Sequence, residues 1–106
     1  MNDIRESQIE ERLRRGLEGK GFKVLKLVTP GNTGTPDRMI LRPSWSPGPP
    51  WFIEIKRPGM HERRLQELVR DGWRARGALV LDMINTYSQV DALVVKLYTQ
   101  CMEERL

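Results

Sequence analysis

Three residues near the middle of the chain combine two acids and one base at a spacing that suits metal-assisted hydrolysis. Asp37 lies at the start of one apolar segment, and Glu54 and Lys56 lie at the end of another. Side chains alternate across a strand, so Glu54 and Lys56 project from the same face. If Asp37 converges on Glu54, the two carboxylates repel each other unless a cation neutralises them. A hard divalent ion meets that need, and phosphodiester hydrolysis is a reaction that such an ion serves.

Each of these residues has an expected role. The ion would bind the carboxylates of Asp37 and Glu54 and the backbone carbonyl of Ile55, with water and a phosphate oxygen completing its shell. Lys56 would orient or help to deprotonate the attacking water and would offset charge in the transition state. One Cys and one His cannot build a zinc site, so Mg²⁺ or Mn²⁺ is the expected ion. The alternative is structural, because an E-x-K triplet alone is typical of an ion pair on an exposed sheet face.

The elements that must position these residues follow from hydrophobic periodicity and turn residues. We expect helices over 4–19 and 61–76 and from Ser88 onward, and strands over 22–28, 38–41, 51–56 and 78–81. The Pro-, Ser- and Gly-rich stretch 43–50 lets the second and third strands form a hairpin, which would place Asp37 beside Glu54. Ser88 is expected to cap the last helix, with Asp91 completing a partial capping box. The order α-β-β-β-α-β-α indicates an α/β fold with a mixed central sheet flanked by helices.

Composition sets broad limits. A length of 106 residues, with 39% hydrophobic and 30% charged residues, predicts a single globular domain over 1–106. The excess of 18 Lys and Arg over 14 Asp and Glu permits contact with phosphates, although it is weak support alone. We find no signal peptide and no apolar run of membrane-spanning length, and a single Cys suits a reducing cytosol. We therefore expect a cytoplasmic protein of a bacterium or a phage-infected cell, without a membrane partner.

The residues around the acid pair resemble a known family. Pro36-Asp37 followed by Glu54-Ile55-Lys56 matches the signature of PD-(D/E)XK nucleases. The wider pattern is similar to the VRR-Nuc (virus-type replication-repair nuclease) family, in its short stand-alone form from phages and bacteria. This pattern runs through Gly34 to Arg38, Trp51 to Gly59, Leu65-Gln66 and Arg76-Gly77. The fold implied by the resemblance is a restriction-endonuclease-like α/β core, in agreement with the expected element order.

The resemblance also implies two supporting residues. One is an acid on the first helix that supports the metal, directly or through water. Glu6 and Glu10 both qualify because they share a helix face, and we favour Glu10. The other is Gln66, whose amide can bind phosphate or position water. Either residue could instead be an ordinary solvated helix position.

Basic residues near these segments are candidates for contact with the DNA backbone. They are Lys26, Arg38, Arg57, Arg63 and Arg64. At least half of the basic residues around the helix at 61–76 are expected to be solvated and balanced by nearby acids.

The sequence therefore predicts a magnesium-dependent DNA endonuclease. The resemblance implies action on branched DNA such as four-way (Holliday) junctions, and symmetric cuts in such a substrate suit a homodimer. The wide apolar side of the last helix can pack on the sheet and is also a candidate dimer surface, with Val90, Leu93, Val94 and Leu97. One alternative is a flap- or end-directed or non-specific nuclease. An alternative of another class is a non-catalytic DNA-binding accessory protein of a phage.

Overall fold

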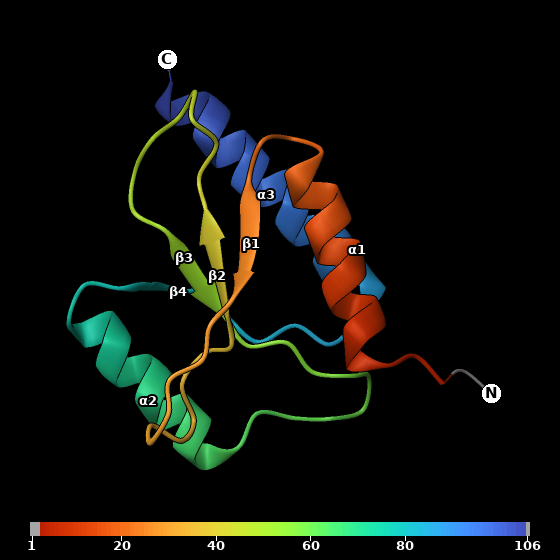
Figure 1. The fold of residues 1–106 in the computed structure, drawn as a ribbon, viewed down its shortest axis with the longest axis vertical. Helices are drawn as coiled ribbons and strands as arrows, with labels where there is room; N and C mark the ends of the chain where they lie inside the picture. Colours follow the sequence, from red (N-terminus) through yellow and green to blue (C-terminus); the bar gives the residue numbers. More distant parts are fainter. Residues whose placement is uncertain (1–2, 106) are drawn as a thin grey trace.

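The computed structural model describes residues 3–105, which form three helices and four strands (Figure 1). In chain order these are α1 (Glu6–Glu18), β1 (Lys23–Lys26), β2 (Arg38–Leu41), β3 (Trp51–Ile53), α2 (Arg64–Ala75), β4 (Leu79–Val80) and α3 (Tyr87–Glu104). The predicted order α-β-β-β-α-β-α and the predicted α/β class are confirmed. None of the helices within this part of the chain combines the length and the apolar character needed to cross a membrane.

The four strands form one mixed sheet in the order β1-β2-β3-β4. β1 pairs with β2 and β2 with β3 in antiparallel fashion, whereas β3 and β4 run parallel. β3 and β4 are shorter than predicted, but Ile55 and Ile84 form a further parallel bridge beyond them. The chain therefore stays extended and parallel to its neighbour past Glu54, although the regular pairing of β3 with β4 is interrupted there.

The core lies between the sheet and the pair formed by α1 and α3, which pack side by side (Figure 1). α1 contributes Ile9, Leu13 and Leu17 to it, and all three side chains are fully buried. Gly16 lets the two helices approach closely, because a Cβ placed there would lie 2.8 Å from a methyl carbon of Val94. α2 lies apart from this pair, next to β4, and contributes no fully buried residue.

The apolar side of α3 is used inside the chain, which overturns one prediction. Val90 and Leu97 are fully buried, and Leu93 and Val94 are only 9% and 8% exposed. The four residues belong to the core cluster that also contains the apolar stripe of α1. They cannot form the predicted dimer surface, because α1 and the sheet already cover them.

The N-terminus of α3 also differs from the prediction. Thr86, not Ser88, is the cap: its hydroxyl accepts a hydrogen bond from the Gln89 N–H at 3.1 Å. Gln89 completes the capping box, because its side-chain oxygen accepts from the Thr86 N–H at 3.2 Å. Ser88 lies inside the first turn and is exposed.

Replacing the two candidate caps tests this assignment. Thr86→Ala removes an acceptor from the helix N-terminus and should lower the free energy of unfolding by about 1 kcal/mol. Ser88→Ala is the matched control and should change it by less than about 0.5 kcal/mol. Urea denaturation followed by circular dichroism measures both. Equal effects of the two variants would contradict the assignment.

Candidate active site

The pairing of β2 with β3 places Asp37 opposite Glu54. The Asp37 N–H donates to the Ile53 carbonyl at 3.2 Å, and Asp37 Oδ1 accepts from the Ile55 N–H at 3.2 Å. These two bonds bracket Glu54, which lies between Ile53 and Ile55 in the sequence. The hairpin inferred from the Pro-rich turn therefore forms, and it brings the two predicted acids together.

Lys56 joins the two acids from the same side of the third strand. Its Nζ lies 3.8 Å from Glu54 Oε1, and the two side chains are only 15% and 14% exposed. The Lys56 N–H donates to the Ile84 carbonyl at 3.0 Å, which continues the parallel alignment beyond β4. Backbone pairing with both neighbouring segments thus fixes the strand that carries Glu54 and Lys56.

Burial and mutual repulsion disfavour negative charge on both carboxylates. The pKa of Glu54 is raised to about 7, first by burial and then by the charge of Asp37, while Lys56 opposes the rise. Burial also raises the pKa of Asp37, against the effects of Arg38 and the Ile55 N–H. Glu54 Oε2 is buried and has no hydrogen-bond partner among residues 3–105. The site therefore disfavours negative charge on its acids, and Glu54 keeps a free carboxylate oxygen.

Gln66, at the start of α2, reaches the same carboxylate. Its Nε2 donates to Glu54 Oε1 at 3.0 Å, and its own side-chain oxygen accepts from the Arg63 N–H at 2.9 Å. The second bond is part of the capping box of α2, so the helix terminus holds the amide in one orientation. The structure thus brings Gln66 into the site.

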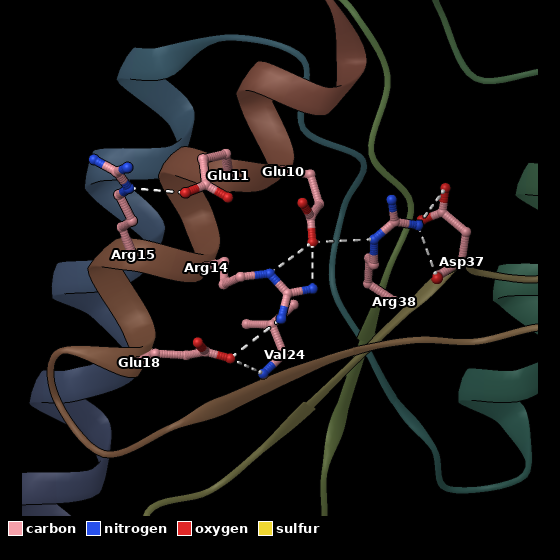
Figure 2. Close-up of polar contacts among 8 residues, drawn as sticks. All are labelled: Glu10, Glu11, Arg14, Arg15, Glu18, Val24, Asp37 and Arg38. Carbon is pink, nitrogen blue, oxygen red and sulfur yellow. Dashed lines mark hydrogen bonds and ion pairs between the residues drawn. The ribbon is translucent and has the colours of Figure 1, made fainter.

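The two candidate acids of α1 occupy different positions. Glu10 is bound by Arg14 at 3.1 and 2.6 Å, and its Oε1 lies 3.8 Å from Arg38 Nε (Figure 2). Glu6 is exposed in the first turn, and its charge contributes to raising the pKa of both Asp37 and Glu54. Glu10 therefore meets Asp37 through a guanidinium, whereas Glu6 acts on both acids through its charge.

The candidate DNA-contacting residues differ in how exposed their side chains are. Lys26, Arg57, Arg63 and Arg64 are exposed. Arg38 is only 8% exposed, and its guanidinium contacts Asp37 and Glu10 instead of facing solvent (Figure 2). The expectation that Arg38 contacts phosphates does not agree with this position.

A small hollow beside Glu54 contains an ion pair that the sequence analysis did not find. Glu62 and Arg70 line it together with Glu54 and Gln66, and the Arg70 guanidinium pairs with the Glu62 carboxylate. Their separation matches no helical i,i+4 pair, and Glu62 lies before α2 begins. Local sequence patterns therefore carried no signal for it.

The number of metal-ligating side chains limits which ions the site can bind. Within residues 3–105, no group of three or more His, Cys, Asp or Glu side chains is arranged to hold a metal ion. Asp37 and Glu54 supply two carboxylates, so a bound ion would also need oxygen ligands from the backbone, water or substrate. Magnesium and manganese accept such mixed oxygen shells.

Comparisons with known proteins agree with the sequence resemblance. No protein-family model matches the chain. A curated phage protein named "Putative nuclease p44", from Acyrthosiphon pisum secondary endosymbiont phage 1, is 39% identical over 59 residues. The match covers 56% of this chain and 60% of that protein. A solved structure described as "VRR_NUC domain" superposes with a TM-score of 0.71 at 28% identity, covering 85% of this chain and 94% of the other. The resemblance to the VRR-Nuc family that the sequence predicted is thus supported by both comparisons, and the chain is similar in fold to a VRR_NUC domain.

Proposed function

We propose that this domain is a metal-dependent DNA endonuclease of the PD-(D/E)XK type, which hydrolyses phosphodiester bonds. The observation that carries the proposal is the convergence of Asp37 and Glu54 at the base of one hairpin, with Lys56 beside them. The phage relative is named as a nuclease, and the similar solved domain is described as VRR_NUC, which supports the same activity.

The residues present fit a hard divalent cation. Glu54 Oε2 is buried without a hydrogen-bond partner among the described residues, and Asp37 raises the pKa of Glu54 by repulsion. A cation relieves both penalties. Mg²⁺ or Mn²⁺ would be held by Asp37, Glu54 and the Ile55 carbonyl, with support from Glu10 or Glu6. When bound, the ion would polarise a phosphate oxygen and lower the pKa of a water molecule.

The chain's own groups do the remaining work. Gln66 fixes Glu54 through its hydrogen bond to Oε1, so the other carboxylate oxygen stays free. The Lys56 ammonium orients the attacking water and offsets the charge that gathers on the phosphate oxygens. The water oxygen forms a bond to phosphorus and loses its proton to solvent, while the bond from phosphorus to the leaving deoxyribose oxygen breaks and that oxygen takes a proton from water. Exposed Arg57, Arg63 and Arg64 hold the DNA backbone.

Substitution of Asp37 and Lys56 tests the activity. Asp37→Asn and Lys56→Ala should each lower the cleavage rate by about 10²-fold or more, because each removes a charge from the reacting centre. DNA binding measured by fluorescence anisotropy should persist. Asp71→Asn and Lys96→Ala are matched controls on exposed helix positions and should cut normally. Normal cleavage by Asp37→Asn would refute the proposal.

Binding of the cation should depend on pH. Glu54, with its pKa raised to about 7, is mainly protonated below that pH and must lose the proton to bind metal. The affinity for Mg²⁺ should therefore increase as the pH rises through 7 and fall roughly tenfold per unit below it. Calorimetric titration of the DNA-free protein at pH 6 and pH 8 measures this. Glu54→Gln should bind weakly at both values, and an equal Mg²⁺ affinity of the native protein at both would contradict the assignment.

We also propose that the preferred DNA is branched and that two copies act together. The resemblance to the stand-alone family form supports this, although the dimer surface must lie outside the buried side of α3. Four-way junctions should be cut faster than flaps or plain duplex of equal length, and light scattering should give twice the monomer mass. Equal rates on all three substrates would favour the non-specific nuclease. Junction binding without cutting, at any metal concentration, would favour the accessory DNA-binding protein.

A further inference from the structure

We propose that Arg38 is a positioning residue whose buried guanidinium sets the orientation of the Asp37 carboxylate. The inference rests on the proposed nuclease function for its kinetic consequence, but its geometric part stands without it. Arg38 begins β2 directly after Asp37, and its guanidinium contacts the carboxylates of Asp37 and Glu10. Its role is to act through its neighbour.

The two oxygens of Asp37 are held from two different sides. Oδ1 accepts the Ile55 N–H of the neighbouring strand at 3.2 Å, and Oδ2 lies 3.4 Å from Arg38 Nη1. The same Nη1 donates to the Asp37 backbone carbonyl at 3.0 Å. A hydrogen bond on one oxygen and an ion pair on the other together favour one orientation of the carboxylate.

The guanidinium is itself held from the opposite end. Arg38 Nε is buried and has no hydrogen-bond partner among residues 3–105, but it lies at ion-pair distance, 3.8 Å, from Glu10 Oε1, and Glu10 is bound in turn by Arg14 (Figure 2). Arg14, Glu10, Arg38 and Asp37 thus form a continuous line of alternating charges from α1 to the site. A buried cation is costly unless acids compensate it, and here an acid lies on each side.

The shape of arginine explains why this position carries that residue. Its separate nitrogens can contact Glu10 and Asp37 at the same time, as a planar fork allows. Lysine supplies the charge from a single nitrogen and cannot contact both acids in this way. A DNA-contacting role does not fit a side chain that is 8% exposed.

A positioning role has a distinct kinetic signature. Loss of Arg38 should misorient Asp37 and lower kcat, while KM for DNA should stay nearly unchanged because no substrate contact is lost. Mutation of a residue that holds a metal ligand in place typically lowers metal affinity or activity about 10–100-fold. We expect a loss of kcat of that order for Arg38→Met. Arg38→Lys retains the charge and should recover part of the loss. Arg15→Met, on an exposed position of α1, is the control and should match the native rate.

Amide hydrogen exchange supplies a readout that does not need catalysis. The Ile55 N–H donates to Asp37 Oδ1, so its exchange should accelerate when Arg38 no longer holds the carboxylate. The Lys56 N–H donates to the Ile84 carbonyl and serves as the internal reference. Faster exchange at Ile55 alone is the expected result for Arg38→Lys and, to a smaller degree, for Glu10→Gln. If Arg38→Met does not fold, these two conservative variants carry the test.

The outcomes separate this inference from the nuclease proposal. If the native protein cuts no DNA, the nuclease proposal is wrong. If the exchange rate of the Ile55 N–H nevertheless depends on Arg38, the positioning role of Arg38 still holds. Raised KM with unchanged kcat in Arg38→Lys would show a substrate contact and overturn the positioning role. Unchanged kcat and unchanged Ile55 exchange in that variant would overturn it as well.

Discussion

The register between β2 and β3 is the constraint on which the site depends. Asp37 meets Glu54 because its N–H and its carboxylate both bond to the backbone of the third strand, at Ile53 and Ile55. A slip of one residue would turn every side chain of β2 to the opposite face of the sheet. The buried Ile40 would then leave the core, so the packing that stabilises the fold also fixes the register. The packing that stabilises this hairpin therefore also keeps the two acids side by side.

Partial burial of its acids distinguishes this region from the exposed surface. Elsewhere acids and bases pair across exposed positions, as Arg12 and Asp91 do, and such pairs contribute little to stability. At the site, two carboxylates share a partly buried space, with Lys56 beside Glu54 and Arg38 beside Asp37, and burial still raises the pKa of both acids. Burial of this kind is destabilising unless a ligand compensates it. The fold tolerates it because the hairpin and the helix termini around it are fixed by other bonds.

Much of the fold could be predicted because periodicity and turn residues are local. The strand at 38–41 appears with the predicted bounds, and the acid pair follows from the hairpin that 43–50 allows. What failed depends on packing between distant segments. An apolar stripe on α3 does not reveal whether α1 or a second chain covers it. Thr86 and Ser88 are both suitable caps, and only the path of the backbone selects one. The burial of Arg38 was equally hidden, because it requires Glu10 on another element to lie beside it.

The tip of the β2–β3 hairpin lies against α3, whereas the acids lie at its other end, nearer to the start of α1. At the turn, the Ser46 hydroxyl donates to the Cys101 carbonyl at 3.2 Å, and Arg42 pairs with Glu104 at 2.7 Å. The last turns of α3 therefore lie against the tip of the hairpin, at its far end from Asp37 and Glu54 (Figure 1). Residues 3–6, in contrast, border a surface hollow shared with Arg57, close to the acids. A partner or affinity handle joined behind α3 would leave the approach to the carboxylates open, whereas one joined ahead of α1 would crowd it.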